Sequence, residues 1–208
     1  MNGGKAAFLA QRPVSRETLA RLECYAALLE KWNGAINLVS KSTLAQLWTR
    51  HFLDSAQIFD LKPEGARSWA DLGSGGGFPG LVIAILAAEA APELRVTLVE
   101  SDIRKATFLS TVARETGVQV EVRPERIEAL APLGADAVSA RALAPLDDLL
   151  GYAARHLAPE GRAIFLKGAA HAQEIEEALA HWRFDVQKHP SKTDPKAVIL
   201  SIGGLARV

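Results

Sequence analysis

The chain has 208 residues, of which 49% are hydrophobic and 23% charged, and its 24 basic residues balance its 24 acidic ones. This composition is typical of a soluble globular domain and excludes disordered, collagen-like and fibrous proteins. A net charge of zero also excludes a strongly basic surface, so any nucleic-acid partner must be bound by a local patch.

The distribution of cysteine, histidine and apolar residues excludes further classes. The single cysteine, Cys24, cannot form an internal disulfide and fits a reducing compartment. The five histidines show no metal-ligand spacing, so no metal site is predicted. The apolar run at 6–10 is too short for a signal peptide, and the run at 78–88 is too short for a bilayer, which needs about 20 residues. We therefore expect a soluble, cytoplasmic protein without a membrane partner.

Two helical segments come first in the chain. A helix is predicted from Ser15 to Gly34, because Ser15 can cap it and apolar residues then recur at steps of three and four positions. A second helix is predicted from Ser42 to about Ile58, followed by a loop at 62–65. We expect residues 1–65 to form a helical extension and residues 66–208 to form the main domain.

After residue 65, short apolar strands alternate with helical segments. Strands are predicted at 68–72, 95–100, 119–123, 136–140 and 163–167. Helices are predicted at 79–90, 102–115, 146–157 and 170–182, with a short helical turn at 126–130. The end of the chain differs, because the two strands predicted at 184–189 and 197–202 have no helix between them.

This order of elements predicts the fold class. Alternating strands and helices form a parallel sheet covered by helices on both faces, with right-handed crossovers. Five such strands and an antiparallel C-terminal pair predict a seven-stranded, doubly wound, Rossmann-like α/β sheet. Ligands of such sheets bind at the carboxyl ends of the strands.

A glycine-rich turn follows the first predicted strand, in the sequence Asp71-Leu72-Gly73-Ser74-Gly75-Gly76-Gly77-Phe78-Pro79-Gly80. Glycines let the backbone turn sharply and approach a ligand, since they have no Cβ atom. Pro79 stands where a helix should begin, because the first helical position needs no amide hydrogen. Glu100 ends the second strand, where a carboxylate can bind ribose hydroxyls. The segment predicts a nucleotide-like ligand.

The turn fits two motifs. Residues 75–80 satisfy the dinucleotide pattern G-x-G-x-x-G. Residues 71–77 satisfy D-x-G-x-G-x-G, which resembles the signature of class I methyltransferases that use S-adenosylmethionine (SAM). The second motif is favoured because it begins at the strand end, and because a carboxylate at Asp71 suits a cationic methionine group better than a pyrophosphate. SAM is therefore the predicted cofactor, and the terminal strand pair is also typical of that class.

What the chain lacks constrains the methyl acceptor. Methylation of pyrimidine C5 usually needs a cysteine nucleophile, but Cys24 lies in the first predicted helix beside Tyr25. Methylation of exocyclic amines commonly uses an Asn/Asp-Pro-Pro-aromatic motif, whereas residues 139–145 read Ser-Ala-Arg-Ala-Leu-Ala-Pro. An acceptor atom with its own lone pair, such as guanine N7, is consistent with both observations.

Five motifs in order resemble those of one family. They are Arg50-His51-Phe52-Leu53-Asp54-Ser55, the turn at 71–80, Arg104-Lys105-Ala106-Thr107-Phe108-Leu109, Ser139-Ala140-Arg141-Ala142 and Leu166-Lys167-Gly168. The chain resembles the bacterial small-subunit ribosomal RNA methyltransferase G, also called glucose-inhibited division protein B, over roughly residues 25–202. The resemblance implies methylation of N7 of a guanosine in 16S ribosomal RNA, at nucleotide position 527.

The resemblance and the turn together assign site residues. Gly73 and Phe78 would contact the cofactor, and Ile127 and Glu128 would flank its adenine. Arg141 would reach the donor pocket. The predicted cofactor-binding residues are Asp71, Gly73, Gly75, Gly77, Phe78, Glu100, Ile127, Glu128 and Arg141. The predicted catalytic residues are Arg141 and Lys167.

Other polar residues have two interpretations. His51 and Asp54 either take part in the acceptor site or dock the N-terminal helices over the cofactor. Lys167 either binds RNA phosphate or ends a solvated strand. The basic residues of the last predicted turn either follow a phosphate backbone or are simply solvated: Lys188, His189, Lys192 and Lys196.

The predicted function is SAM-dependent methylation of guanine N7 in 16S ribosomal RNA. The expected partner is this RNA or the small ribosomal subunit, and the expected oligomeric state is a monomer. The main competing hypothesis is a class I methyltransferase acting on another RNA, a small molecule or a protein. Two further hypotheses are a binding module that has lost catalysis and a dinucleotide-binding enzyme.

Overall fold

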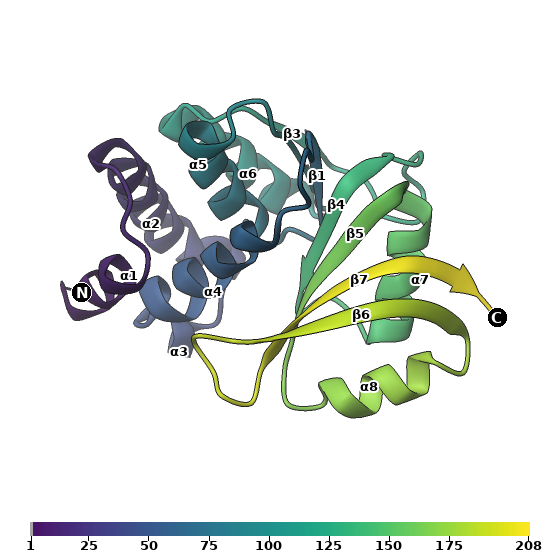
Figure 1. Ribbon diagram of the computed structural model, residues 1–208. Coiled ribbons are helices and arrows are strands. Elements are labelled where there is room, and N and C mark those ends of the chain that lie inside the picture. Colours follow the sequence, from purple (N-terminus) through teal and green to yellow (C-terminus); the bar gives the residue numbers. More distant parts are fainter. Residues whose placement is uncertain (1) are drawn as a thin grey trace.

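The computed structural model describes residues 2–208, and a seven-stranded sheet forms its centre (Figure 1). The strands are β1 (Ser68–Leu72), β2 (Arg95–Val99), β3 (Val120–Arg123), β4 (Ala135–Arg141), β5 (Leu157–Lys167), β6 (Trp182–Pro190) and β7 (Val198–Arg207). Their order is β3-β2-β1-β4-β5-β7-β6. The first five strands are parallel, and β7 pairs antiparallel with β5 and β6. The predicted fold class is confirmed.

Helices cover both faces of the sheet, because successive residues of a strand point to opposite sides. The helices of the main domain are α5 (Gly80–Ala90), α6 (Ile103–Thr116), α7 (Leu146–His156) and α8 (His171–Ala178). In β5, Ile164 belongs to the apolar cluster that includes α5 and α6, and Phe165 belongs to the cluster that includes α7 and α8. Burial on both faces explains why the central strands read as nearly continuous apolar runs.

The N-terminal extension has more elements than predicted. They are α1 (Asn2–Gln11), α2 (Arg16–Ile36), α3 (Lys41–Leu44), the π-helix η1 (Leu47–Leu53), α4 (Asp54–Ala56) and the 3-10 helix η2 (Gln57–Leu61). The sequence pattern did not predict α1, whose apolar run of five residues is short. Its Phe8 is fully buried and packs edge-on against Trp48, with ring centroids 5.5 Å apart. Tertiary packing therefore supplies the stability that this short helix lacks alone.

The prediction of one helix at 42–58 is wrong, because four short segments occupy that stretch. At its centre, the backbone carbonyl of Arg50 accepts a hydrogen bond from the Arg141 guanidinium, at 3.2 Å. A side chain that bonds to a helix carbonyl can disturb the regular backbone ladder. Apolar periodicity cannot show such a contact, since Arg141 lies 91 positions further along the chain.

Other differences are small. β5 begins at Leu157 rather than 163, and α8 ends at Ala178 rather than 182. The single turn predicted at 126–130 is present, because the amides of Ala129 and Leu130 donate to the Arg126 carbonyl. Pro79 is the residue before α5, and its first helical residue is Gly80.

The extension packs directly on the sheet domain. One apolar cluster contains residues of α2, η1, α5 and α6, and the ring of Tyr25 stacks on that of Phe78, with centroids 5.3 Å apart. The boundary predicted at residue 65 stays a prediction, since both segments share this core. Over residues 2–208, no helix is long and apolar enough to span a membrane.

Candidate active site

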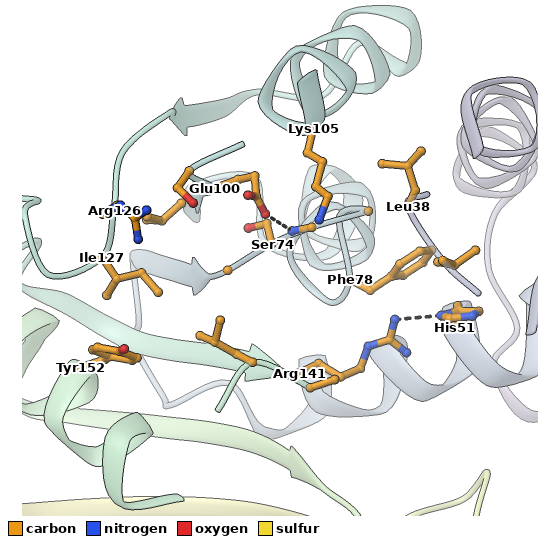
Figure 2. Close-up of a pocket in the computed structure, with 18 of the residues that line it drawn as sticks. Leu38, His51, Ser74, Phe78, Glu100, Lys105, Arg126, Ile127, Arg141 and Tyr152 are labelled. Carbon is orange, nitrogen blue, oxygen red and sulfur yellow. Dashed lines mark hydrogen bonds between the residues drawn. The ribbon is translucent and has the colours of Figure 1, made fainter. Parts of the chain in front are cut away.

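A cavity of about 650 Å³ lies at the carboxyl ends of β1, β2 and β4 (Figure 2). Its walls come from the glycine-rich turn, from residues after β2, β3 and β4, and from the N-terminal extension. This is where doubly wound sheets bind their ligands. Of the predicted cofactor-binding residues, those that line it are Gly73, Gly75, Phe78, Glu100, Ile127, Glu128 and Arg141.

The turn after β1 brings backbone rather than side chains to the cavity. Gly73, Gly75 and Gly77 have φ angles of 66°, 55° and 93°, in the left-handed region that glycine adopts without a steric penalty. A Cβ atom on Gly73 would lie 2.5 Å from Cδ1 of Leu143, on the cavity wall. A Cβ atom on Gly77 would lie 2.6 Å from the hydroxyl of Tyr25. Gly77 does not line the cavity. Its lack of a side chain instead lets the turn pack closely against Tyr25 and Leu81.

The structure corrects the expectation for Asp71, which is fully buried beneath the turn and does not line the cavity. Its Oδ2 accepts a hydrogen bond from the Gly80 amide at 3.1 Å, and its Oδ1 accepts one from the Ser139 hydroxyl at 2.7 Å. Burial raises the pKa of Asp71 to about 6, although these hydrogen bonds and Arg141 oppose the shift. Asp71 thus holds the first amide of α5 and positions the turn.

Glu100 lies on the cavity wall opposite Arg141 (Figure 2). Its Oε2 accepts a hydrogen bond from the Gly75 amide and its Oε1 accepts one from the Asp102 amide, both at 2.8 Å. Each carboxylate oxygen has a second lone pair. Glu100 can therefore accept hydrogen bonds from two neighbouring hydroxyls, as a ribose presents them.

Apolar side chains line the part of the cavity beyond Glu100. Figure 2 shows Ile127 and the ring of Tyr152 there, and Val99 and Leu143 also line the cavity. The Tyr152 hydroxyl donates to Oε1 of Glu128 at 2.8 Å, and the pKa of Glu128 is lowered first by a hydrogen bond from its own backbone and then by this bond. Flat apolar walls with a polar rim suit a heteroaromatic ring.

Arg141, the last residue of β4, is the centre of a hydrogen-bonded network at the other end of the cavity. Its Nη2 donates to Nδ1 of His51 at 2.8 Å, and its Nη1 lies 3.5 Å from Oδ2 of Asp54. Its guanidinium also lies over the Phe78 ring, 5.0 Å from the centroid (Figure 2). Ala142 follows with a φ of 51°, which is uncommon for a residue other than glycine.

His51 is neutral in this network. Arginine only donates hydrogen bonds, so Nδ1 of His51 accepts, and the Nε2 hydrogen is directed to Oγ1 of Thr43 at 2.9 Å. Burial, together with the nearby charges of Arg141 and Arg50, lowers the pKa of His51 to about 3. His51 and Asp54 do not bond to each other but to Arg141, and they fix it to the N-terminal extension.

The loop between β6 and β7 joins the same network, which the sequence pattern did not predict. Thr193 donates from Oγ1 to Oδ1 of Asp54 at 2.7 Å, and the amide of Lys192 donates to Oε1 of Gln57 at 2.9 Å. Thr193 and Asp54 are 139 positions apart. No local pattern signals such a pair.

Lys167 does not line the cofactor cavity. It lines a neighbouring cavity of about 330 Å³, which shares Arg141 and Ala142 with the first. Lys188, Lys192 and Lys196 are exposed on β6 and the loop after it. Both interpretations of these three lysines remain predictions.

The sheet order, the antiparallel β7 and the glycine-walled cavity define a class I SAM-dependent methyltransferase. A SAM-dependent O-methyltransferase from Thermotoga maritima shares this fold, with a TM-score of 0.51 and 14% identity over 72% of this chain and 64% of that one. The family model of rRNA small subunit methyltransferase G matches residues 18–198. The chain belongs to this family.

Two relatives show how much of the chain the family likeness covers. The Ribosomal RNA small subunit methyltransferase G of Ruegeria sp. (strain TM1040) is 54% identical over 195 residues, which are 94% of this chain and 95% of that protein. The protein of the same name from Paramagnetospirillum magneticum is 50% identical over 204 residues, or 98% and 97% of the two chains. The N-terminal extension is thus part of the shared protein.

Proposed function

We propose that the chain methylates N7 of the guanosine at nucleotide position 527 of 16S ribosomal RNA, with SAM as methyl donor. The observation that carries the proposal is the cavity in which Gly73, Glu100 and Arg141 meet, in a chain that belongs to the rRNA small subunit methyltransferase G family.

The residues present fit SAM. The glycine turn leaves room for the methionine part, the Glu100 carboxylate suits the ribose hydroxyls, and Ile127 offers an apolar wall to the adenine ring. When bound, SAM supplies a methyl group that leaves its sulfur without the bonding electron pair, so the acceptor must provide a lone pair. Arg141 can bind the carboxylate of the methionine part, since its guanidinium lines the same cavity.

Methylation at guanine N7 needs no general base, because this atom already has a lone pair. The groups around Arg141 agree with this requirement. His51 is neutral but uses both ring nitrogens in hydrogen bonds, and Asp54 bonds to Thr193 and Gln57. These residues position others rather than receive a proton, so catalysis rests on the placement of donor and acceptor.

Nucleoside mass spectrometry of 16S ribosomal RNA from cells with and without this gene tests the proposal. We expect one 7-methylguanosine to disappear with the gene and to return with the wild-type chain. Unchanged 16S ribosomal RNA, with a loss of methylation in another RNA, a protein or a metabolite, would favour one of those acceptors instead.

The substrate of this reaction also indicates the partner of the enzyme and its compartment in the cell. The substrate is 16S ribosomal RNA or the small subunit, so we infer a cytoplasmic enzyme. We also infer a monomer, which light scattering of the purified protein tests directly.

A further inference from the structure

The second cavity adjoins the cofactor cavity through a shared wall made of Arg141 and Ala142. Strand register places it there, because Arg141 pairs with Leu166 of β5, and the next residue, Lys167, pairs with Val198 of β7. A group bound in the second cavity would therefore lie beside a methyl donor bound in the first.

A partly buried ion pair lies in the wall of this second cavity. Nζ of Lys167 lies 2.5 Å from Oε2 of Glu174, and the two side chains are 9% and 21% exposed. Lys167 also donates to the carbonyl of Ala144 at 3.2 Å, and Oε2 of Glu174 accepts from the amide of Leu146 at 2.8 Å. Both side chains line the cavity.

Each partner keeps hydrogen-bonding capacity. A lysine ammonium has three hydrogens, and Lys167 directs one of them to the Ala144 carbonyl besides its ion pair with Glu174. Oε1 of Glu174 accepts no hydrogen bond from residues 2–208. The cavity wall therefore offers one donor beside one acceptor.

Stability alone gives little reason for such a pair. Removing two charges from water costs free energy, and apolar residues of similar volume are often as stabilising as a buried ion pair. Binding a group of complementary polarity in the cavity would give this ion pair a function beyond stability.

Guanine has this complementary polarity. Its O6 accepts, and the neighbouring N1–H and N2–H2 groups donate, whereas adenine presents an amino group where guanine has O6. We propose that the second cavity receives the target guanine, with Lys167 donating to O6 and Glu174 accepting from N1–H or the 2-amino group. This inference rests on the proposed function and makes the pair a specificity determinant of the acceptor site.

The pair also fits the charge change of the reaction. The N7 lone pair forms the new bond to the methyl carbon while the electron pair of the old bond stays on sulfur, so the methylated base gains one positive charge and loses no proton. The carboxylate of Glu174 would stabilise this cation, and it would also hold the base in the unstacked position that such enzymes require.

The test measures methyl transfer from labelled SAM to small subunits purified from cells lacking this gene. Glu174→Gln should lower kcat/KM by about 10- to 100-fold, as expected when a hydrogen bond to a charged group is lost. The dissociation constant for SAM should stay within about twofold of wild type. The matched control is Glu176→Gln, because Glu176 is exposed on the same helix, and it should leave both quantities unchanged.

A second variant separates base recognition from a structural role. The double variant Lys167→Glu with Glu174→Lys restores an ion pair with the charges exchanged, so it should bind SAM but remain inactive. The inference would be overturned if Glu174→Gln were as active as Glu176→Gln, or if the exchanged pair recovered activity. In either case, activity of the wild type would still support the proposed function. Failure of the wild type on these subunits would overturn both.

Discussion

The two ends of the cofactor cavity are built in different ways. At the end formed by the turn after β1, the ligand surface is mostly backbone, and neighbouring residues of one continuous segment make it. At the Arg141 end, the surface consists of side chains from β4 and the N-terminal extension, and the β6–β7 loop supports them from outside the cavity through the Thr193–Asp54 hydrogen bond. The first end depends on the local conformation of glycines, and the second depends on the packing of distant segments.

This difference predicts how each end fails. A substitution in the turn should disturb folding and cofactor binding together, because the backbone conformation itself is the site. A substitution in the Arg141 network should reduce catalysis more than stability, because the sheet and its core do not depend on that network.

The largest effect is expected for Arg141→Ala. Removing the guanidinium takes a donor from Nδ1 of His51, from the Arg50 carbonyl and from Asp54. We expect kcat/KM for methyl transfer to fall at least about 100-fold, since a hydrogen bond to a charged group contributes about 1.5–3 kcal/mol. Arg104→Ala is the control, because this arginine is exposed and pairs only with Asp102 among the residues described. Activity of Arg141→Ala within threefold of this control would remove Arg141 from the site.

Gly77→Ala should give the largest loss of stability. Its φ of 93° is unfavourable for alanine, and the new Cβ atom would meet the Tyr25 hydroxyl and the Leu81 side chain. Strain and overpacking together should lower the free energy of unfolding by about 3 kcal/mol, measured by urea denaturation. Gly65→Ala isolates the strain, since its φ is 72° and no atom lies within 4 Å of the new Cβ. Equal losses in both variants would show that the turn is not tightly packed.

Asp71 should make stability depend on pH. Its pKa in the folded protein is about 6, against 3.8 for the free side chain, so the folded state favours the protonated carboxyl. The resulting stabilisation is fully present below about pH 4 and is lost as the pH rises through 6, and it amounts to about 3 kcal/mol.

The measurement compares urea denaturation of wild type and Asp71→Asn from pH 4 to pH 7. Because asparagine does not titrate, the free energy of unfolding of wild type relative to the variant should decrease over this range. A difference that stays constant, or that increases with pH, would contradict the raised pKa.

The smallest effect is expected for Tyr25→Phe. Its hydroxyl donates to the Gly76 carbonyl at 2.5 Å and supports the turn from the N-terminal extension. Losing this bond should cost about 1 kcal/mol of stability and weaken SAM binding about fivefold by calorimetry. Thr107→Val serves as the control, because this residue is exposed, does not line the cavity, and its hydroxyl bonds only to the Ile103 carbonyl among residues 2–208. An effect of the control as large as that of Tyr25→Phe would show that the Tyr25 hydroxyl does not support the turn.

The sequence alone determined the fold class and the position of the glycine-walled cavity. Alternating strands and helices, the glycine turn and the carboxylate of Glu100 are all local in the chain, because periodicity and backbone preference act over a few residues. For that reason Gly73, Gly75 and Glu100 were predicted and do line the cavity, as does Phe78, which the family resemblance implied.

Only the tertiary structure decided which side chains meet. Asp71 was expected in the cavity, but its side chain points to Gly80 and Ser139 instead. Arg141 bonds to His51 across 90 positions, and Lys167 lies with Glu174 in a second cavity. Such pairs depend on how the sheet register and the packed helices bring distant segments together, and no pattern within a short stretch of sequence contains that information.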